Sequence, residues 1–191
     1  MNNKYDVIVI GGGHAGCEAV HAAHRKKLKT CLISISKKSI GQMSCNPAIG
    51  GLGKTHLVKE IDSAGGIMAE ATDASGIQYR TLNTRKGETV RSLRVQCDRE
   101  KYKEAVQKIL KDTDIEIIEA EVDDIEINNG KAKAVILDNG KKLKGEAIIL
   151  TTGTFLRGVM YKGDEKIEGG RVGDKASIKL AERLYSLKLP M

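Results

Sequence analysis

The sequence predicts an α/β protein built on a parallel β-sheet that carries an inserted antiparallel β-meander. Three observations predict this class. A short β-branched strand at 7–10 runs directly into a glycine-rich turn and a helix. A second short apolar strand at 30–35 completes a strand–helix–strand unit. Two Asn-Gly pairs, at 129–130 and 139–140, separate short alternating segments, which is typical of β-hairpins.

The glycine-rich turn fits the spacing G-x-G-x-x-G and follows a buried strand. In such a unit the first glycine permits a tight turn, the second lets the main chain approach a pyrophosphate, and the third lets helix and strand pack closely. Free N–H groups and the helix dipole favour an anion there. The turn therefore predicts a dinucleotide site, the alternative being a turn that binds nothing. The candidate residues are Gly11, Gly12, Gly13, His14, Ala15 and Gly16, with His14 expected to shape the turn.

Length and composition set broad limits on the class of protein. The chain has 191 residues, 40% hydrophobic and 30% charged, which suits a soluble globular chain. It shows no apolar run of membrane-spanning length and no signal core, so a cytoplasmic protein without membrane contact is expected. Four cysteines without a C-x-x-C pair predict reduced thiols and no metal site. The net charge of +7 fits either a polyanionic partner or simple solubility.

Two positions in the first strand–helix–strand unit depart from the usual pattern. Lys27 stands where a glycine commonly ends the helix at 15–26, so a different helix cap is expected. The second strand ends in Ser34-Ile35-Ser36, whereas dinucleotide folds often place there an acidic residue that binds the ribose hydroxyls. A serine hydroxyl or the main chain could substitute for that carboxylate.

The rest of the chain predicts a second, more irregular half. The glycine-rich segment 41–54 is expected to be an ordered functional loop, and 78–99 is basic and weakly patterned. Further elements are expected as a helix at 56–64, a helix at 98–110, a strand at 115–118, meander segments at 122–127, 132–137 and 142–144, a strand at 147–150, a glycine-rich passage to 173 and a helix at 177–187.

The returning strand at 147–150 is closed by a Thr-Gly pair, Thr152-Gly153. A strand–helix–strand unit, a meander and such a closing pair are typical of an FAD-binding, Rossmann-like domain of the glutathione-reductase type. We therefore expect one FAD-binding domain over residues 1–191, with the meander at about 120–145 and with Thr152 and Gly153 near the cofactor.

Five segments resemble the MnmG family, also called GidA, and the resemblance covers essentially the whole chain. They are Gly-Gly-Gly-His-Ala-Gly-Cys-Glu at 11–18, Gly-Gln-Met-Ser-Cys-Asn-Pro-Ala-Ile-Gly-Gly at 41–51, His-Leu-Val-Lys-Glu-Ile-Asp at 56–62, Gly-Ile-Gln-Tyr-Arg at 76–80 and Leu-Thr-Thr-Gly-Thr-Phe-Leu at 150–156. The family provides the FAD-binding subunit of the enzyme that adds carboxymethylaminomethyl groups to the wobble uridine of tRNA.

This resemblance implies further properties of the chain. It implies NADH as reductant, tRNA as substrate, an MnmE-type GTPase partner and a homodimer in the full-length form. It also implies that Val122 lies beside the adenine, that Ser177 lies near the cofactor, and that this chain is an N-terminal fragment of a longer architecture.

The resemblance also singles out Cys45 as the catalytic residue. A cysteine in a glycine-rich loop near a helix start and Lys54 could have a lowered thiol pKa and act as nucleophile or acid. From the residues alone, a buried packing cysteine is the favoured reading. The resemblance reverses that preference, because the family's loop cysteine is implicated in uridine chemistry. Cys17, Cys31 and Cys97 are expected to pack as apolar groups.

Three readings of function compete. The first is an FAD-dependent tRNA-modifying enzyme, the second a folate- and FAD-dependent tRNA uridine methyltransferase, and the third a truncated, non-catalytic module that binds FAD or a partner. Arginines between 80 and 99 suit phosphate contacts with tRNA or a solvated loop equally well. Glu18, His21 and His24 share one helix face, but such spacing arises by chance and no fourth metal ligand is indicated.

Overall fold

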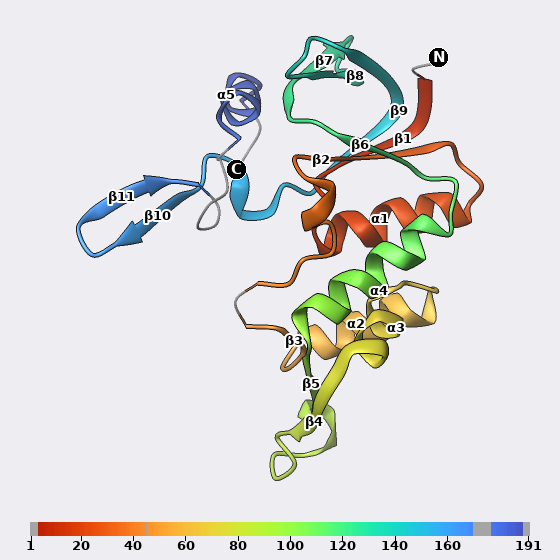
Figure 1. Cartoon of the computed structure of the whole chain (residues 1–191), viewed down its shortest axis with the longest axis vertical. Coiled ribbons are helices and arrows are strands. Elements are labelled where there is room, and N and C mark those ends of the chain that lie inside the picture. The colour runs from red at the N-terminus through yellow and green to blue at the C-terminus, as the bar shows by residue number, and fades with distance from the viewer. Residues whose placement is uncertain (1–3, 45, 170–176, 189–191) are drawn as a thin grey trace.

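A computed structural model of the chain describes residues 4–44, 46–169 and 177–188 (Figure 1). The helices are α1 (His14–Arg25), α2 (Lys54–Ser63), α3 (Met68–Ser75), α4 (Arg99–Lys111) and α5 (Ile178–Ser186). The strands are β1 (Lys4–Ile10), β2 (Thr30–Ser34), β3 (Ala48–Gly50), β4 (Gly76–Leu82), β5 (Ser92–Cys97), β6 (Glu116–Glu119), β7 (Val122–Asn128), β8 (Lys131–Leu137), β9 (Lys142–Leu150), β10 (Val159–Lys162) and β11 (Glu165–Glu168).

The main sheet has six strands in the order β6-β2-β1-β9-β8-β7. Strands β6, β2, β1 and β9 run parallel, and β8 and β7 extend the sheet as antiparallel neighbours. Asn129 and Gly130 both have positive φ (51° and 74°), which is the conformation that a two-residue hairpin turn requires. The predicted α/β class with an inserted antiparallel meander is confirmed.

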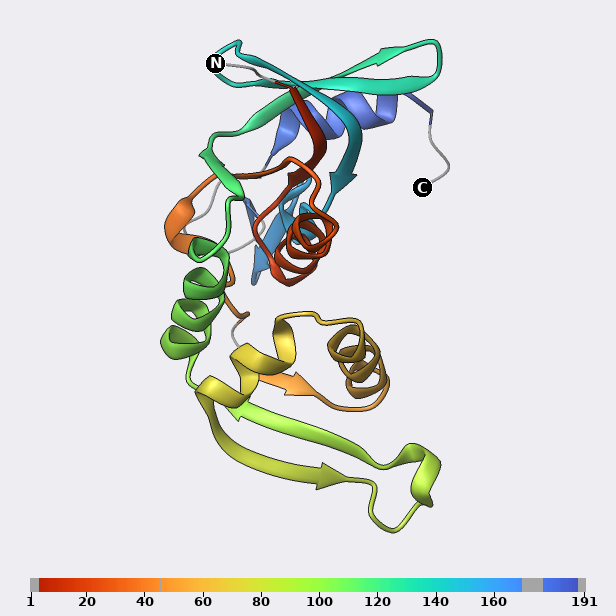
Figure 2. The same ribbon diagram turned by 90° about the vertical axis from the view of Figure 1, so that its right-hand side faces the viewer.

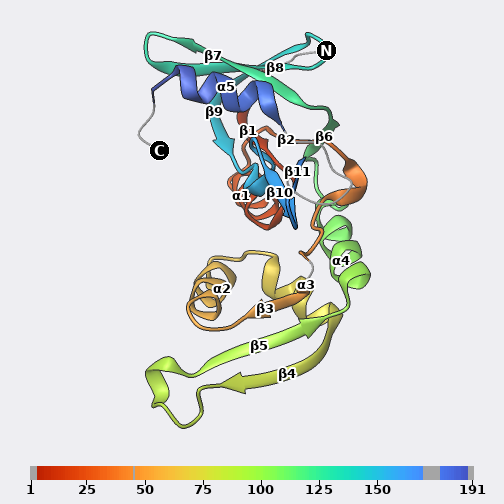
Figure 3. The same cartoon turned by 90° about the vertical axis from the view of Figure 1, so that its left-hand side faces the viewer.

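Successive side chains of β1 point to opposite faces of the sheet, and each face packs against a different core. Val7 and Val9 belong to a core shared with α1 and α4, while Ile8 and Ile10 belong to a second core shared with the meander and α5. Helix α5 lies alongside β7 and β8 (Figure 3). Residues 7–10 of β1 are apolar at every position and are buried on both faces of the sheet, as the β-branched segment predicts.

Strand β9 is longer than predicted. The expected segments 142–144 and 147–150 form one strand, which pairs antiparallel with β8 up to Lys144 and parallel with β1 from Lys144 onward. Gly145 lies at the change of partner, where an added Cβ would come within 2.9 Å of the Ile8 side chain. Lys144 and Glu146 flank this glycine, and these charged residues made the sequence look like two short strands instead of one.

A second sheet, β3-β5-β4, forms a separate lobe with α2 and α3, as Figure 2 shows. The weakly patterned stretch 78–99 is thus the hairpin β4–β5, which the sequence analysis did not predict. Every residue of β4 is exposed or only partly buried, so the strand lacks the alternation that identifies a half-buried strand. Helix α3 and the hairpin β10–β11 were likewise not predicted.

The end of α1 differs from the expectation for Lys27. This residue adopts the left-handed conformation that glycine usually takes there, with φ of 59°. Its N–H donates to the His24 carbonyl at 2.7 Å, and the Leu28 N–H donates to the Ala23 carbonyl at 3.3 Å. These two bonds form a Schellman motif, so the usual cap is present with lysine in the place of glycine.

Within residues 4–44, 46–169 and 177–188, no helix combines the length and the apolar character that crossing a membrane requires.

Candidate cofactor site

The turn between β1 and α1 is held by main-chain hydrogen bonds on several sides. Gly11 has φ of 108°, and its N–H donates to the Ile33 carbonyl at 2.8 Å. The Thr151 hydroxyl donates to the carbonyls of Ile10 and Gly11 at 2.9 and 3.1 Å. Because β2 and the residue that follows β9 supply these contacts, the turn is fixed before any ligand binds.

The three glycines of the motif differ in what surrounds them. An added Cβ would lie 2.4 Å from the Thr151 carbonyl oxygen at Gly11 and 1.8 Å from the Gly11 carbonyl oxygen at Gly16. At Gly13 it would meet nothing within 4 Å, and this residue is exposed at the N-cap of α1. Gly11 and Gly16 are therefore required by the fold, whereas the space beside Gly13 is open to a ligand.

A cavity of about 390 Å³ opens beside this turn, at the carboxyl ends of the parallel strands. Open α/β sheets bind their ligands at this edge. The predicted site residues that line the cavity are Gly11, Gly12, Gly13, His14, Val122, Thr152, Gly153 and Ser177. Ala15 and Gly16 do not line it: Ala15 is exposed on α1, and Gly16 is buried beneath the turn.

Val122 and Ser177 come from distant parts of the chain and close other sides of the cavity. Both side chains are almost fully buried. The Ser177 N–H donates to the Phe155 carbonyl at 2.9 Å, and its carbonyl accepts from the Arg157 N–H at 3.2 Å. Ser177 thereby joins the start of α5 to the segment that follows β9.

Several further polar residues line the cavity. Ser34 and Ser36 belong to the strand end where the sequence suggests a serine as a ribose ligand, whereas the sequence did not link the others to the cofactor: Ser39, Gln42, Ser44, Asn46, Glu121, Thr151 and Thr154. Most of them follow the carboxyl end of a parallel strand or lie in the 41–54 loop. These residues could be identified as cavity residues only once it was known which strand ends lie side by side in the folded sheet.

Cys45 lies outside the described residues, but its neighbours Ser44 and Asn46 line the cavity, as does Lys54. The Lys54 ammonium group donates to the Ala48 carbonyl at 3.4 Å, and burial lowers the pKa of this amine. The Arg94 guanidinium donates to the Asn46 side chain at 3.1 Å. The 41–54 loop is therefore connected both to the cavity and to the hairpin β4–β5.

The other three cysteines are buried in the core, as the sequence analysis expects. Burial raises the thiol pKa of Cys17 and of Cys31 to about 12 and also raises that of Cys97. Because the thiolate is the reactive form, these three residues are inert packing groups at neutral pH.

His14 is held from the side by helix α4. Its Nδ1 lies 3.3 Å from the Tyr102 hydroxyl, and the two rings meet edge to face with centroids 5.4 Å apart. Tyr102 is buried, and burial raises the pKa of its phenol above the usual range. This contact fixes the start of α1 against α4, in agreement with a shaping role for His14.

Glu18 and His24 have structural partners. The Glu18 carboxylate accepts from the Ile67 and Met68 N–H groups at the start of α3. His24 Nδ1 lies 2.6 Å from the Asp114 carboxylate. The residues that the structure describes contain no cluster of three or more side chains suited to a metal ion.

The comparisons with known proteins agree with this geometry. The family model described as glucose inhibited division protein A matches residues 6–191. A tRNA uridine 5-carboxymethylaminomethyl modification enzyme MnmG from Zymomonas mobilis is 50% identical over the whole chain, which spans 31% of that relative. The chain thus covers about a third of the length of its relative.

Solved structures give the same result. GidA from Aquifex aeolicus superimposes with a TM-score of 0.94 at 45% identity, over 98% of this chain and 31% of that one. A GidA-related protein from Thermus thermophilus shares the fold, with a TM-score of 0.69 at 18% identity over 96% of this chain and 68% of that one. The chain belongs to the glucose-inhibited division protein A family, also called GidA or MnmG.

Proposed function

We propose that this chain is the FAD-binding part of an enzyme that modifies tRNA uridine by carboxymethylaminomethyl addition. The observation that carries the proposal is the cavity, which lies between the glycine turn on one side and Val122 and Ser177 on the other. The proposal is supported by 50% identity to a tRNA uridine 5-carboxymethylaminomethyl modification enzyme. That identity favours this reading over the related uridine methyltransferase.

The residues present fit an FAD molecule. The space beside Gly13 lies at the start of a helix that has no acidic residue in its first turn and no side-chain cap, and the positive end of such a helix favours phosphate oxygens. The residues that would hold the cofactor are Gly11, Gly12, Gly13 and His14 at the diphosphate, Val122 at the adenine, and Thr152, Gly153 and Ser177. Ala15 and Gly16 do not line the cavity and would act by shaping the turn and the start of α1. When bound, FAD accepts and donates hydride.

Binding selectivity tests the cofactor assignment. The isolated chain is expected to bind FAD at one equivalent and to bind FMN far more weakly, because FMN lacks the adenosine half and the second phosphate. Flavin fluorescence titration of the purified chain measures both affinities. Equal affinity for FMN would contradict the assignment of the Val122 side to adenine. Bound FAD without turnover by the isolated chain would favour the non-catalytic module instead.

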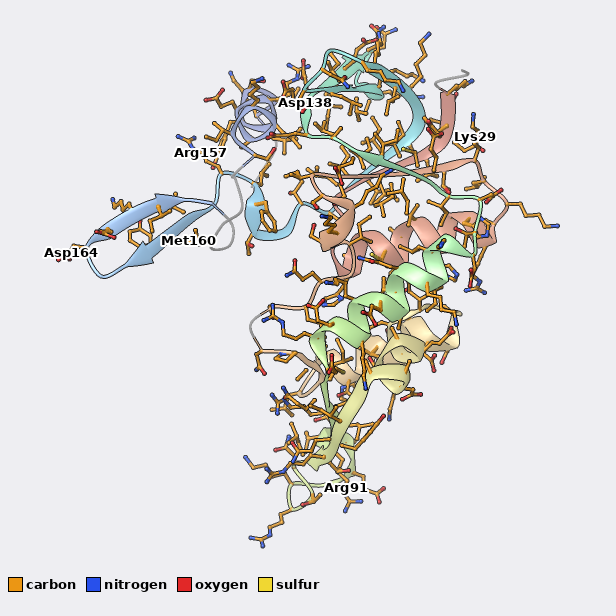
Figure 4. The ribbon with its side chains drawn as sticks, in the orientation of Figure 1. Lys29, Arg91, Asp138, Arg157, Met160 and Asp164 are labelled. Carbon is orange, nitrogen blue, oxygen red and sulfur yellow. The ribbon has the colours of Figure 1, made fainter. Side chains whose placement is uncertain are left out.

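We further propose that hairpin β4–β5 contacts tRNA phosphates. Arg80 and Arg94 are direct cross-strand partners, and like charges placed opposite each other destabilise a hairpin unless an anion lies near them. Arg91 lies near the hairpin tip, as labelled in Figure 4. Arg94 also contacts Asn46 at the cavity, so a polyanion on this hairpin would reach the cavity edge.

Salt dependence tests this contact in a longer family protein that contains this chain. Alanine at four positions is expected to weaken tRNA binding and to reduce the slope of log affinity against log salt by about 0.7–0.9 for each lost phosphate contact. The four positions are Arg85, Lys86, Arg91 and Arg94. A control with alanine at exposed meander lysines should keep the slope, at Lys131, Lys133, Lys141 and Lys144. An unchanged slope in the hairpin variant would make the hairpin a solvated surface.

Cys45 remains a proposed catalytic residue on the basis of the family resemblance. Its sequence neighbours Ser44 and Asn46 line the cavity, which supports placing the thiol near bound substrate. In a longer protein, Cys45→Ser should bind flavin and tRNA and lose most turnover per bound flavin, because a hydroxyl is a weaker nucleophile and acid. Near-normal turnover would make Cys45 structural.

Three further assignments rest on the resemblance alone: NADH as reductant, an MnmE-type GTPase as partner, and a homodimer. Residence in the cytoplasm is proposed from the lack of a signal core and of a membrane-spanning apolar run in the sequence. Native mass measurement with and without the GTPase tests the two assembly proposals, and flavin reduction by NADH in a longer protein tests the reductant.

A further inference from the structure

We infer that Glu121 supplies the carboxylate that binds the ribose hydroxyls of the adenosine half of the dinucleotide. This inference rests on the proposed FAD site and assigns a residue that replaces the acid missing from the end of β2. Two observations support it: the parallel pairing of β2 with β6, and the presence of Glu121 in the wall of the cavity.

The end of β2 offers no carboxylate and uses its serines locally. The Ser34 hydroxyl donates to the Ser36 carbonyl at 3.0 Å. The Ser36 hydroxyl accepts from the Lys38 N–H at 3.3 Å, and the Ser39 hydroxyl donates to the Ser36 carbonyl at 2.9 Å. These bonds hold the serine hydroxyls to the turn after β2, and the nearest other segment at this edge of the sheet is the end of the adjacent strand.

That adjacent strand is β6, which runs parallel to β2 with Ser34 paired to Glu119. The residues that follow β6 therefore lie at the same edge of the sheet as the end of β2, where dinucleotide folds usually place the ribose-binding acid. The Glu119 carboxylate accepts from the Lys37 N–H at 2.7 Å and is thus engaged outside the cavity wall. The Ala120 N–H donates to the Ser34 carbonyl at 3.0 Å, which fixes the next step of the chain against the end of β2.

Glu121 follows at once and lines the cavity. Among the described lining residues it is the only carboxylate. Its main chain is fixed, because its carbonyl accepts from the Asp138 N–H at 2.9 Å and the next residue, Val122, is buried. Glu121, a partly buried residue, thereby lies next to Val122 and the proposed adenine position, at the edge of the sheet that also holds the glycine turn.

A carboxylate at this position matches the chemistry of a ribose diol. Its two oxygens can accept from the 2′- and 3′-hydroxyl groups together, as the usual acid at the end of the second strand does. The same charge repels a 2′-phosphate. Glu121 would therefore bind an unphosphorylated adenosine ribose and exclude a 2′-phosphorylated one.

This contact is tested by removing the Glu121 carboxylate from the protein and the ribose hydroxyls from the ligand, first separately and then together. The probes are ADP, 2′,3′-dideoxyadenosine diphosphate and 2′-phospho-ADP, with competition against FAD as the readout for each chain. The wild-type chain should prefer ADP over the dideoxy compound by roughly 10- to 100-fold, the range expected for hydrogen bonds to a charged group. In Glu121→Gln this preference should fall to a few-fold, and binding of 2′-phospho-ADP should rise.

Glu119→Gln is the matched control, because it removes one charge from the same sheet edge outside the cavity wall and should keep the wild-type preference. A wild-type preference in Glu121→Gln, or an equal loss for ADP and the dideoxy compound, would overturn the inference. If the wild-type chain binds neither FAD nor ADP, the proposed function fails as well. Thermal melting of both variants shows whether each chain is folded during the measurement.

Discussion

Gly13→Val is expected to abolish FAD binding while the chain remains folded. The backbone at Gly13 has φ of −74° and ψ of −175°, which a valine adopts readily, and an added Cβ meets no atom of the chain within 4 Å. The isopropyl group would instead occupy the space at the start of α1 where the diphosphate must bind. We expect affinity for FAD to fall at least ~100-fold, because steric exclusion also removes the phosphate contacts to the N–H groups of the helix.

Two comparisons make this result specific. Ala22→Val adds branched bulk to the exposed side of α1, and it should retain FAD. Gly16→Ala should fail for a different reason, because its Cβ would lie 1.8 Å from the Gly11 carbonyl oxygen and the turn could not pack. Flavin absorbance after gel filtration, measured beside circular dichroism, separates the two kinds of failure. A folded Gly13→Val chain with a full complement of flavin would contradict the site.

The parts of the fold that the sequence predicts are those set by local chemistry. The apolar segment at 7–10, the glycine turn at fixed spacing and the Asn-Gly pairs are all local sequence features, so β1, α1 and the meander could be recognised. The amphipathic segment that forms α4 could also be recognised, because Tyr102, Val106 and Leu110 share its buried face.

The parts that escape prediction depend on partners distant in sequence. Strand β4 has no buried residue and forms by pairing with β5, while the eight-residue helix α3 is too short to be stable without tertiary contacts. The same limit applies to the site. Glu121 becomes a candidate ligand only when β6 is known to lie beside β2, and no local sequence motif predicts that pairing.

Glu18→Ala is expected to destabilise the chain by roughly 3 kcal/mol, through loss of hydrogen bonds to a charged acceptor. The Glu18 carboxylate accepts from the Ile67 N–H at 3.1 and 3.2 Å and from the Met68 N–H at 2.6 Å. These are unpaired donors at the start of α3, whose own N-cap Ile67 provides no side-chain bond. The negative charge also faces the positive end of the helix dipole.

Urea unfolding followed by circular dichroism measures this loss. Glu18→Gln keeps an accepting oxygen and should lose less, about 1 kcal/mol, because only the charge is removed. Glu104→Ala, at an exposed position of α4, provides the matched control and should stay within about 0.5 kcal/mol of wild type. If Glu18→Ala unfolds at the same urea concentration as Glu104→Ala, the carboxylate is not what anchors α3 to α1. The contact between the two lobes must then be maintained by the apolar core and by other bonds such as that from the Arg25 guanidinium to the Ala64 carbonyl.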